Sequence, residues 1–181
     1  MNIDKVIKER RSIRHFKKKD VSWEKINEIV ESIIYAPCAG EIQNWRPIVL
    51  RNKGQLNDIC FNQSAVINCN FLVVVCSDNS DLKAHYKDRW DIFAIQNTSA
   101  AVQNMLLKAA SMKIGSCWIG VYDEEKIRIS LEIPDEIDIH SIIAFGYPDE
   151  KPDMPLRASL GNIINYDRFG NKKKDVFPLK K

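Results

Sequence analysis

Apolar residues recur at helical spacing in two stretches near the start of the chain. The stretch 3–7 holds three branched apolar residues on one face, which predicts a short amphipathic helix. Over 26–34, apolar residues fall at positions i, i+3, i+4, i+7 and i+8. Ser22 is a suitable N-cap for this second helix, and Pro37 disfavours its continuation. We therefore expect a helix that begins after Ser22 and ends by Pro37.

Two further helices are predicted in the second half of the chain. An apolar stripe of the same spacing covers 102–110, and Gly115 is expected to end that helix. Its small residues allow close packing, as a core helix or as part of a subunit interface. Asp123 can cap a fourth helix, which should continue through Leu131 and end at Pro134.

Short apolar runs between these helices predict strands. The run 71–76 is β-branched and apolar on both faces, which is typical of a central strand covered on both sides. Weaker signals predict strands at 47–51, closed by a turn at 52–54, and at 141–145. Helices and strands therefore alternate, and the expected class is mixed α and β.

Length and composition indicate a globular protein. The chain has 181 residues and 45% hydrophobic content, enough for one domain of ordinary size. No apolar stretch reaches the roughly 18 residues of a membrane span, and the N-terminus lacks the apolar region of a secretory signal. We expect a cytoplasmic protein without a membrane partner.

The cysteines and the net charge exclude several other classes. Five cysteines, an odd number without a close C-x-x-C pair, predict reduced thiols and neither a disulfide framework nor a metal site. The net charge is only +3, and much of the excess lies in lysine runs at 17–19, 172–174 and 180–181, which we expect in solvated loops and tails. No motif for reading nucleic acid is present, so a nucleic-acid partner is not expected.

Candidate chemistry first appears at residues 9–16. Arg10, Arg11 and Arg14 place three guanidiniums around the hydroxyl of Ser12, directly after the first predicted helix. A helix C-terminus repels anions, so the guanidiniums themselves would attract a phosphate, which their planar forks bind well. A solvated basic face is the alternative interpretation of this run.

A second candidate is the loop 36–47, which follows the second predicted helix. Its small residues Ala39 and Gly40 allow the backbone to approach a flat ligand closely. The Gln43 amide can donate to and accept from a heteroaromatic edge. An ordinary connection between a helix and a strand remains the alternative.

These two runs together resemble the nitroreductase family of FMN-dependent flavoproteins. The family carries an Arg-x-Ser-x-Arg/Lys motif near the N-terminus and an Ala-Pro-Ser-Ala-Gly-Asn-x-Gln-Pro-Trp loop after its second helix. Two further landmarks, at 100–120 and 145–148, follow in the same order. The resemblance covers nearly the whole chain. It implies an α+β fold over 1–181, a central, mostly antiparallel sheet flanked by helices, and an interlocked homodimer with FMN at the subunit interface.

The resemblance also implies which residues bind the cofactor. Arg10, Ser12 and Arg14 match the phosphate and ribityl contacts, Arg11 matches through its backbone, and Arg157 is a second phosphate candidate, with a surface arginine as its alternative. The remaining matches fall in three groups: the loop from the partner subunit (Pro37, Cys38, Ala39, Gln43), an amide at the pyrimidine edge (Asn62, or Gln63 if the register slips), and backbone along the isoalloxazine (Cys117, Trp118, Ile119, Gly120). For Trp118, a core position is the slightly favoured alternative.

The chain departs from the family pattern at three points. Glu41 replaces an asparagine, Asn44 replaces a proline, and Asn97 stands where an aspartate is frequent before the long helix. A carboxylate at Glu41 would disfavour negative charge on reduced flavin and could lower its potential. Cys38 has no flanking base, which favours an inert thiol.

The implied activity is ping-pong hydride transfer from NADH or NADPH through FMN to a nitroaromatic, a quinone or a similar acceptor. We assign no catalytic side chain, because the flavin N5 carries the chemistry and neither His15 nor His85 has a carboxylate at an obvious pairing distance in the sequence. No G-x-G-x-x-G follows a strand, so any NAD(P)H would share the flavin cleft. Alternatives are other flavin chemistry on the same scaffold, such as flavin reduction, enone reduction or dehalogenation, and a noncatalytic FMN-binding protein.

Overall fold

The computed structural model describes residues 2–52 and 54–172. Lys53, within the turn predicted at 52–54, and the tail lysines from position 173 onward lie outside these residues. The core element is a four-stranded sheet in the order β1-β2-β4-β3, and every neighbouring pair is antiparallel. Its strands are β1 Trp45–Leu50, β2 Phe71–Asp78, β3 Gly115–Ile119 and β4 Ile137–Gly146. The predicted α+β class and antiparallel sheet are confirmed.

The strand β2 lies in the middle of the sheet, as its sequence predicts. Alternate residues of β2 enter two separate cores, because successive side chains of a strand point to opposite faces. Phe71 stacks on Phe145 of β4 with ring centroids 4.9 Å apart in one of these cores. The three strands predicted from sequence are all present, with ends that differ by at most four residues.

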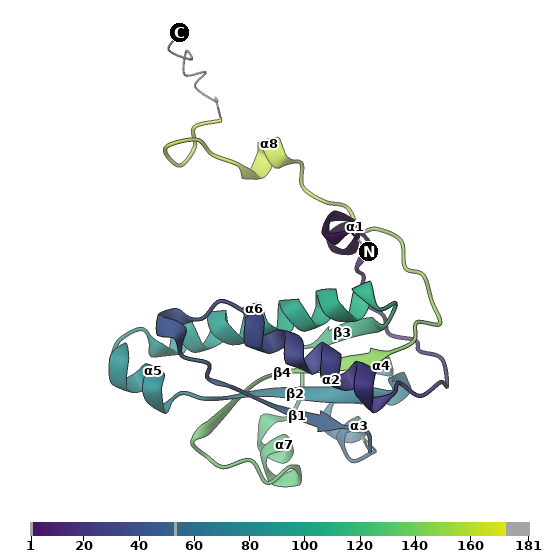
Figure 1. Cartoon of the computed structure of the whole chain (residues 1–181). Helices are drawn as coiled ribbons and strands as arrows, with labels where there is room; N and C mark the ends of the chain where they lie inside the picture. Colours follow the sequence, from purple (N-terminus) through teal and green to yellow (C-terminus); the bar gives the residue numbers. More distant parts are fainter. Residues whose placement is uncertain (1, 53, 173–181) are drawn as a thin grey trace.

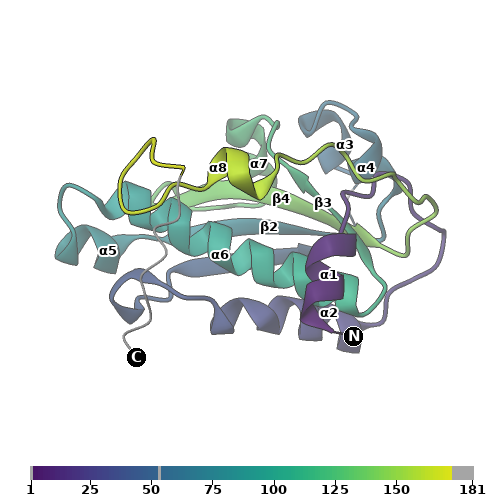
Figure 2. The ribbon, with the colours of Figure 1, turned by 90° about the horizontal axis from the view of Figure 1, so that it is seen from above.

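Two long helical elements cover one face of the sheet. These are α2 Trp23–Glu31, extended by the 3-10 turn η1 Ser32–Tyr35, and α6 Trp90–Ser111. Figure 2 shows α6 lying across the whole length of the sheet. The Ser22 hydroxyl accepts a hydrogen bond from the Lys25 N–H at 3.5 Å, so the predicted N-cap is confirmed.

The ends of α6 differ from the prediction. The helix begins at Trp90, so Asn97 lies inside it, and not before it as expected. It ends at Ser111, where the chain turns through Lys113 in the left-handed conformation and the Ile114 N–H donates to the Ala109 carbonyl at 2.9 Å. Gly115 therefore does not end the helix but begins β3.

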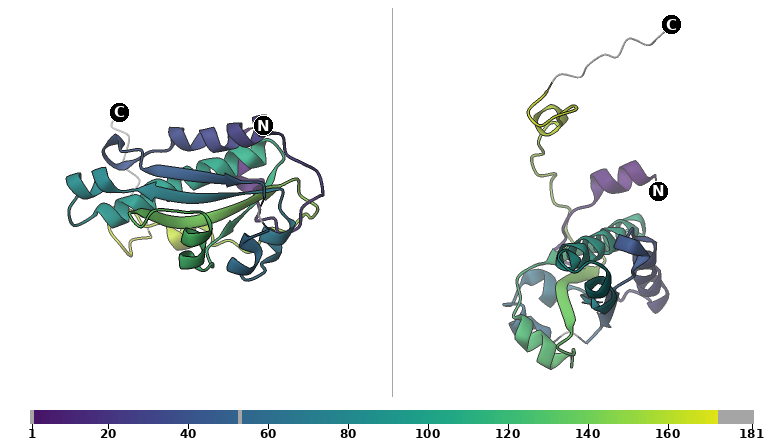
Figure 3. Two further views of the ribbon diagram at one scale, coloured as in Figure 1. Left: turned by 90° about the horizontal axis from the view of Figure 1, so that it is seen from below. Right: turned by 90° about the vertical axis from the view of Figure 1, so that its left-hand side faces the viewer.

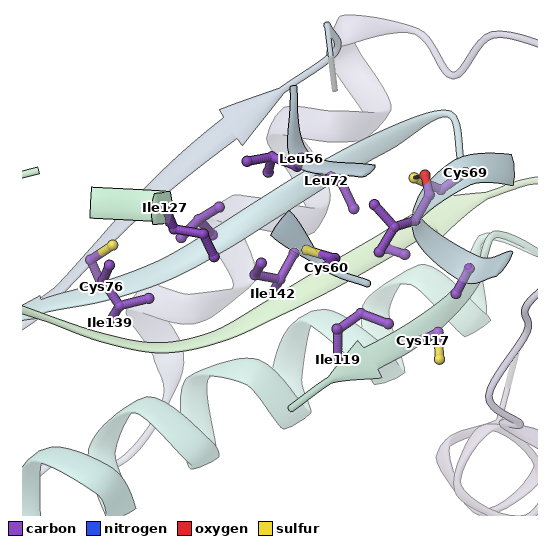
Figure 4. Packing of buried hydrophobic residues seen from close by; sticks show 14 of the residues in the cluster. Leu56, Cys60, Cys69, Leu72, Cys76, Cys117, Ile119, Ile127, Ile139 and Ile142 are labelled. Atoms are coloured by element: carbon purple, nitrogen blue, oxygen red, sulfur yellow. Dashed lines mark hydrogen bonds between the residues drawn. The ribbon is translucent and has the colours of Figure 1, made fainter. Parts of the chain in front are cut away.

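Short helices cover the opposite face. They are α3 Leu56–Ile59, α4 Ser64–Asn68 and α7 Glu124–Ser130. Figure 4 shows the apolar side chains between them and the sheet, including Leu56, Ile127 and Ile142. The Asp123 carboxylate accepts from the Lys126 N–H at 3.1 Å, which confirms this cap, although α7 ends before the predicted Pro134.

Two segments extend from this layered body. The helix α1 Ile3–Glu9 lies against the C-terminal end of α6, and the C-terminal arm, residues 151–172, runs past α1 and away from the sheet (Figure 1 and Figure 3). The arm contains α8 Leu160–Ile163, and the short helix α5 Ser80–His85 connects β2 to α6. Within the part of the chain that the structure describes, no helix has the length and apolar composition needed to cross a bilayer.

Candidate functional site

The arginine segment, residues 10–14, lies along the edge of the sheet. Ser12 pairs with Ser116 in a parallel bridge, and the Ile13 N–H donates to the Ser116 carbonyl at 2.9 Å. The Ile13 side chain is buried against Gly115, where a Cβ atom would lie 2.8 Å from the Cγ1 of Ile13. The absence of a side chain at Gly115 therefore allows the segment to approach β3 this closely.

The side chain of Glu150 holds the C-terminal end of the arginine segment. The Glu150 carboxylate accepts hydrogen bonds from the backbone N–H groups of Arg14 and, at 3.1 Å, of His15. The bond from the Arg14 N–H is the main reason why the pKa of Glu150 lies below its ordinary value. The backbone of Lys17 also bonds the Tyr147 carbonyl at 2.8 Å. The arginine segment is thus held between β3 and the chain that follows β4.

In the part of the chain that the structure describes, no guanidinium group of this segment forms an ion pair with a carboxylate. None of the ion pairs among the described residues involves Arg10, Arg11, Arg14 or Arg157. Burial, and then the charges of Arg11 and Arg157, lower the pKa of Arg10. Arg157 itself is exposed on the C-terminal arm and lines neither of the two pockets described below. This excess of positive charge fits an anion such as the phosphate predicted from the sequence.

The side chain of Arg11 bonds the backbone at the end of α1. Its Nη1 donates to the carbonyls of Lys8 at 2.7 Å and Arg10 at 2.8 Å, which satisfies acceptors at the end of α1. Its Nε is buried and has no hydrogen-bond partner among residues 2–52 and 54–172.

A pocket of about 340 Å³ opens on one side of the arginine segment. Arg14 lines it together with Cys117, Trp118 and Ile119 of β3 and with the start of α4, so four of the predicted residues meet there. Trp118 is 40% exposed, and the alternative of a core aromatic is wrong. Burial raises the pKa of the Cys117 thiol, which favours its neutral form. Gly120 follows β3 and is exposed.

Gln63 lines this pocket, whereas Asn62 does not. The Gln63 Nε2 donates to the carbonyls of Cys60 at 2.9 Å and Val121 at 2.7 Å, so its amide is fixed beside β3. Asn62 is exposed with a left-handed backbone (φ 52°). Of the two amides considered from the sequence, Gln63 has the better position.

A second pocket, of about 760 Å³, lies on the other side of the segment. Arg10 and Arg11 line it, with Lys5 of α1 and Lys113 beyond α6. Glu9, Glu150 and Asp153 line it as well, so this pocket carries both charges, whereas the smaller pocket holds Arg14 and no acidic residue among those described.

The loop 36–44 lies elsewhere. Its 3-10 turn η2 Ala39–Glu41 contains Gly40 and Glu41 in left-handed conformations, and the Ala39 N–H donates to the Asn97 Oδ1 at 2.9 Å. Pro37 and Gln43 are exposed. Burial and the charge of Glu41 raise the pKa of the Cys38 thiol, in agreement with an inert side chain.

The structure does not bring this loop to the arginine segment within one chain. Of the described residues, neither pocket is lined by any from 36–44. The loop contacts α6 at Asn97, while the arginine segment lies beside Ala110, about 20 Å further along the helix axis at the usual rise per residue. The sequence did not identify Glu150 as part of the site, because it lies 136 residues from Arg14. Only the pairing of the segment with the sheet reveals it.

Comparison with known proteins agrees with this geometry. The model of the nitroreductase family matches residues 7–62 and 54–147. A protein of Archaeoglobus fulgidus that bears the provisional name NADH dehydrogenase/NAD(P)H nitroreductase is 36% identical over 176 residues, covering 93% of this chain and 97% of its own.

Solved structures show the same fold. Nitroreductase A from Vibrio parahaemolyticus superposes with a TM-score of 0.85 at 21% identity, over 94% of this chain and 78% of its own. An FMN-dependent nitroreductase from Clostridium difficile gives a TM-score of 0.76 at 26% identity, over 91% and 98% of the two chains. Sequence and fold therefore place this chain in the nitroreductase family of oxidoreductase enzymes.

Proposed function

We propose that the protein binds FMN and transfers electrons from NADH or NADPH to small acceptors such as nitroaromatics or quinones. The observation that carries the proposal is the unpaired guanidinium cluster beside the pocket on β3. The name of the Archaeoglobus relative supports the nicotinamide donor, and the name of the Clostridium structure supports FMN.

The residues of this chain would bind and orient the cofactor. Arg10 and Arg14 of the arginine segment would bind the phosphate, and Arg157 of the C-terminal arm stays a further candidate from the sequence. The strand β3 lies at the edge of the sheet, so backbone groups that do not pair with β4 can contact the ring system. The Gln63 carbonyl oxygen can accept from the pyrimidine edge while its Nε2 is held by the backbone. FMN, when bound, would supply the hydride chemistry that no side chain here provides.

We also propose that the active protein is a homodimer whose partner supplies the loop 36–44 to each site. The distance between that loop and the arginine segment supports this arrangement. The C-terminal arm exposes Leu156 and Phe169 almost completely, and α6 exposes Ile92 and Ile95, so both present apolar surface that a second chain can cover. One domain and a cytoplasmic location remain predictions from the sequence.

The test is an anaerobic absorption titration. FMN is added to the purified protein and, in parallel, riboflavin, which lacks the phosphate. We expect FMN to bind about tenfold or more tightly, because charge-assisted bonds to phosphate are lost with riboflavin. NADH and then NADPH should bleach the bound flavin. Failure to bind FMN would refute the proposal.

Bound FMN that neither nucleotide reduces would favour a noncatalytic protein or another donor. The exposed Glu41 at the tip of the loop favours a second candidate, other flavin chemistry on the same scaffold. A carboxylate near the ring would lower the flavin potential, which makes the reduced flavin a stronger reductant and its reduction by NAD(P)H less favourable, and so would shift the choice of acceptors toward those of lower potential. Measured potentials of the wild type and of Glu41→Gln distinguish the two: an unchanged potential removes this candidate.

A further inference from the structure

Three buried asparagines, one of them at the end of the loop 36–44, link that loop to the middle of the sheet. Asn44 precedes β1, Asn79 follows β2, and Asn97 is in α6; each residue is at most 3% exposed. Hydrogen bonds join them into one series, which ends at the Asp138 carboxylate on β4. We call these four residues the amide chain.

The amide chain has a direction. The Asp138 carboxylate can only accept, and it accepts from the Asn79 Nδ2 at 2.6 Å. The Asn79 Oδ1 is then free to accept from the Asn44 Nδ2 at 2.7 Å, and the Asn44 Oδ1 accepts from the Asn97 Nδ2 at 3.1 Å. Each amide orientation therefore follows from the one before it.

The last acceptor of the chain reaches the loop. With its Nδ2 committed to Asn44 and, at 3.3 Å, to the Ile42 carbonyl, Asn97 presents its Oδ1 to the Ala39 N–H at 2.9 Å. These two contacts hold both ends of the turn that contains Gly40 and Glu41 in left-handed conformations. Buried amides in low dielectric are costly to leave unpaired, so the loop conformation is coupled to the whole series.

We infer that the amide chain is a positioning device for the loop 36–44, in which Asp138 sets the orientation of Asn97 and thereby the place of the loop at the cofactor. The inference rests on the proposed function for the cofactor contact alone. Asn44 and Asn97 are two of the three departures from the family pattern, and they bond each other. The two departures are thus parts of one arrangement.

The test reverses the direction of the chain. In Asn97→Asp, a carboxylate oxygen replaces the Nδ2 group, so it faces two other acceptors, the Asn44 Oδ1 and the Ile42 carbonyl. If Asn44 and Asn79 rotate their amides to donate toward position 97, the Asn79 Oδ1 then faces the Asp138 carboxylate, which is again a pair of acceptors. In the double variant Asn97→Asp with Asp138→Asn, all three bonds can re-form in the opposite sense. Only the Ile42 carbonyl then lacks its donor, so recovery should be large but incomplete.

Two readouts are measured on the full-length protein at about pH 8, where the introduced carboxyl is ionised. One is hydrogen exchange of the Ala39 amide without cofactor, and the other is the dissociation constant of FMN. We expect Asn97→Asp to raise the Ala39 exchange rate and the FMN dissociation constant about tenfold each. The double variant should bring both values most of the way back to those of the wild type. Asp138→Asn alone should change little, because an amide still offers an acceptor to Asn79.

Asn104→Ala is the matched control. Asn104 is the same residue type two turns further along α6 and donates to the Ser32 carbonyl at 3.1 Å, away from the loop. Its loss should leave Ala39 exchange unchanged. If Asn97→Asp does not fold, the double variant alone decides the question, because it is expected to fold.

A double variant as defective as Asn97→Asp, or Ala39 exchange that none of these changes affects, overturns the inference. FMN affinity that stays constant while Ala39 exchange responds also overturns it, because the loop would then lie away from the cofactor. If the exchange pattern holds but no variant or wild type binds FMN, the amide chain stands and the proposed function fails.

Discussion

The two parts of the candidate site are held in place by different kinds of bond. Backbone groups mainly hold the arginine segment: the Ile13 N–H donates to the Ser116 carbonyl, and just beyond the segment the Lys17 N–H donates to the Tyr147 carbonyl. The Glu150 carboxylate is the one side-chain acceptor described for the segment. Side-chain amides hold the loop 36–44, above all through Asn97. Backbone pairing tolerates most changes of side chain, whereas the amide chain keeps its hydrogen bonds only if each of its side chains is present. The loop is therefore the part that a few substitutions can reposition.

The strongest test of this comparison separates the two parts between chains. We expect Arg14→Ala and Gly40→Val homodimers both to bind FMN poorly. Gly40 has φ +58°, and any Cβ there would lie 2.5 Å from the Tyr86 hydroxyl oxygen, so valine must disturb the loop. In a mixed dimer, one site carries both changes and the other carries neither. The mixed dimer should bind one FMN with wild-type affinity.

The mixed dimer is purified through two different affinity tags and titrated with FMN. Mixed dimers of wild type with each single variant are the controls, and each should retain one intact site. If every contact came from a single chain, no site in the doubly mutated dimer would be intact, and absence of tight binding would reject the shared site.

Within the arginine segment, Arg14→Ala should have the largest effect of any single charge. The loss of a charge-assisted bond to phosphate is expected to weaken FMN binding by roughly 1.5–3 kcal/mol. Arg14→Lys keeps the charge but not the planar guanidinium, so its FMN affinity should lie between those of the wild type and Arg14→Ala. Calorimetric titration with FMN measures the series. Arg51→Ala, which removes a guanidinium that stacks on Trp23, is the control, and an unchanged affinity in Arg14→Ala would exclude Arg14 from the site.

Gly115→Ala tests whether backbone proximity holds the arginine segment. The added methyl group would crowd Ile13 and should destabilise the fold by about 1–3 kcal/mol, with a loss of FMN affinity of about tenfold or less. Hydrogen exchange at Ala39 should not change, because the loop is anchored separately. Gly54→Ala, where no atom lies within 4 Å of the added carbon, is the matched control. Faster exchange at Ala39 would show that the two parts are not independent.

The fold could be predicted where local chemistry decides it. Ser22 and Asp123 cap helices as expected, and the doubly apolar run of β2 is central. The apolar pattern did not predict the first half of α6, because there apolar residues face outward and a polar residue faces inward: Ile92 and Ile95 are exposed, while Asn97 is buried. Helical periodicity detects an apolar face toward the core of one chain, so a helix that turns apolar residues outward escapes it.

The site could be predicted only in part for a related reason. The match of motifs led to Arg14 and β3, which the sheet brings together, but chose Asn62 where Gln63 lines the pocket. The bond between Asn79 and Asp138 within the amide chain and the bond from Arg14 to Glu150 join residues far apart in sequence. No local pattern marks them, because they exist only once the strands have paired.

Glu150→Gln should have the smallest effect and tests the side-chain contribution within the backbone-held part. Glutamine can still accept from the Arg14 and His15 N–H groups but without charge, so FMN affinity at neutral pH should fall only about threefold.

The pKa of Glu150 is lowered in the folded protein, so the carboxylate stabilises the fold above its unfolded pKa, and this contribution disappears as the pH falls through the folded value. The wild type should therefore lose stability more steeply than Glu150→Gln below about pH 4.5. Thermal unfolding across this range measures the difference, with Glu136→Gln as the control for the loss of an exposed carboxylate. Parallel curves for wild type and Glu150→Gln would mean that backbone pairing alone holds the arginine segment.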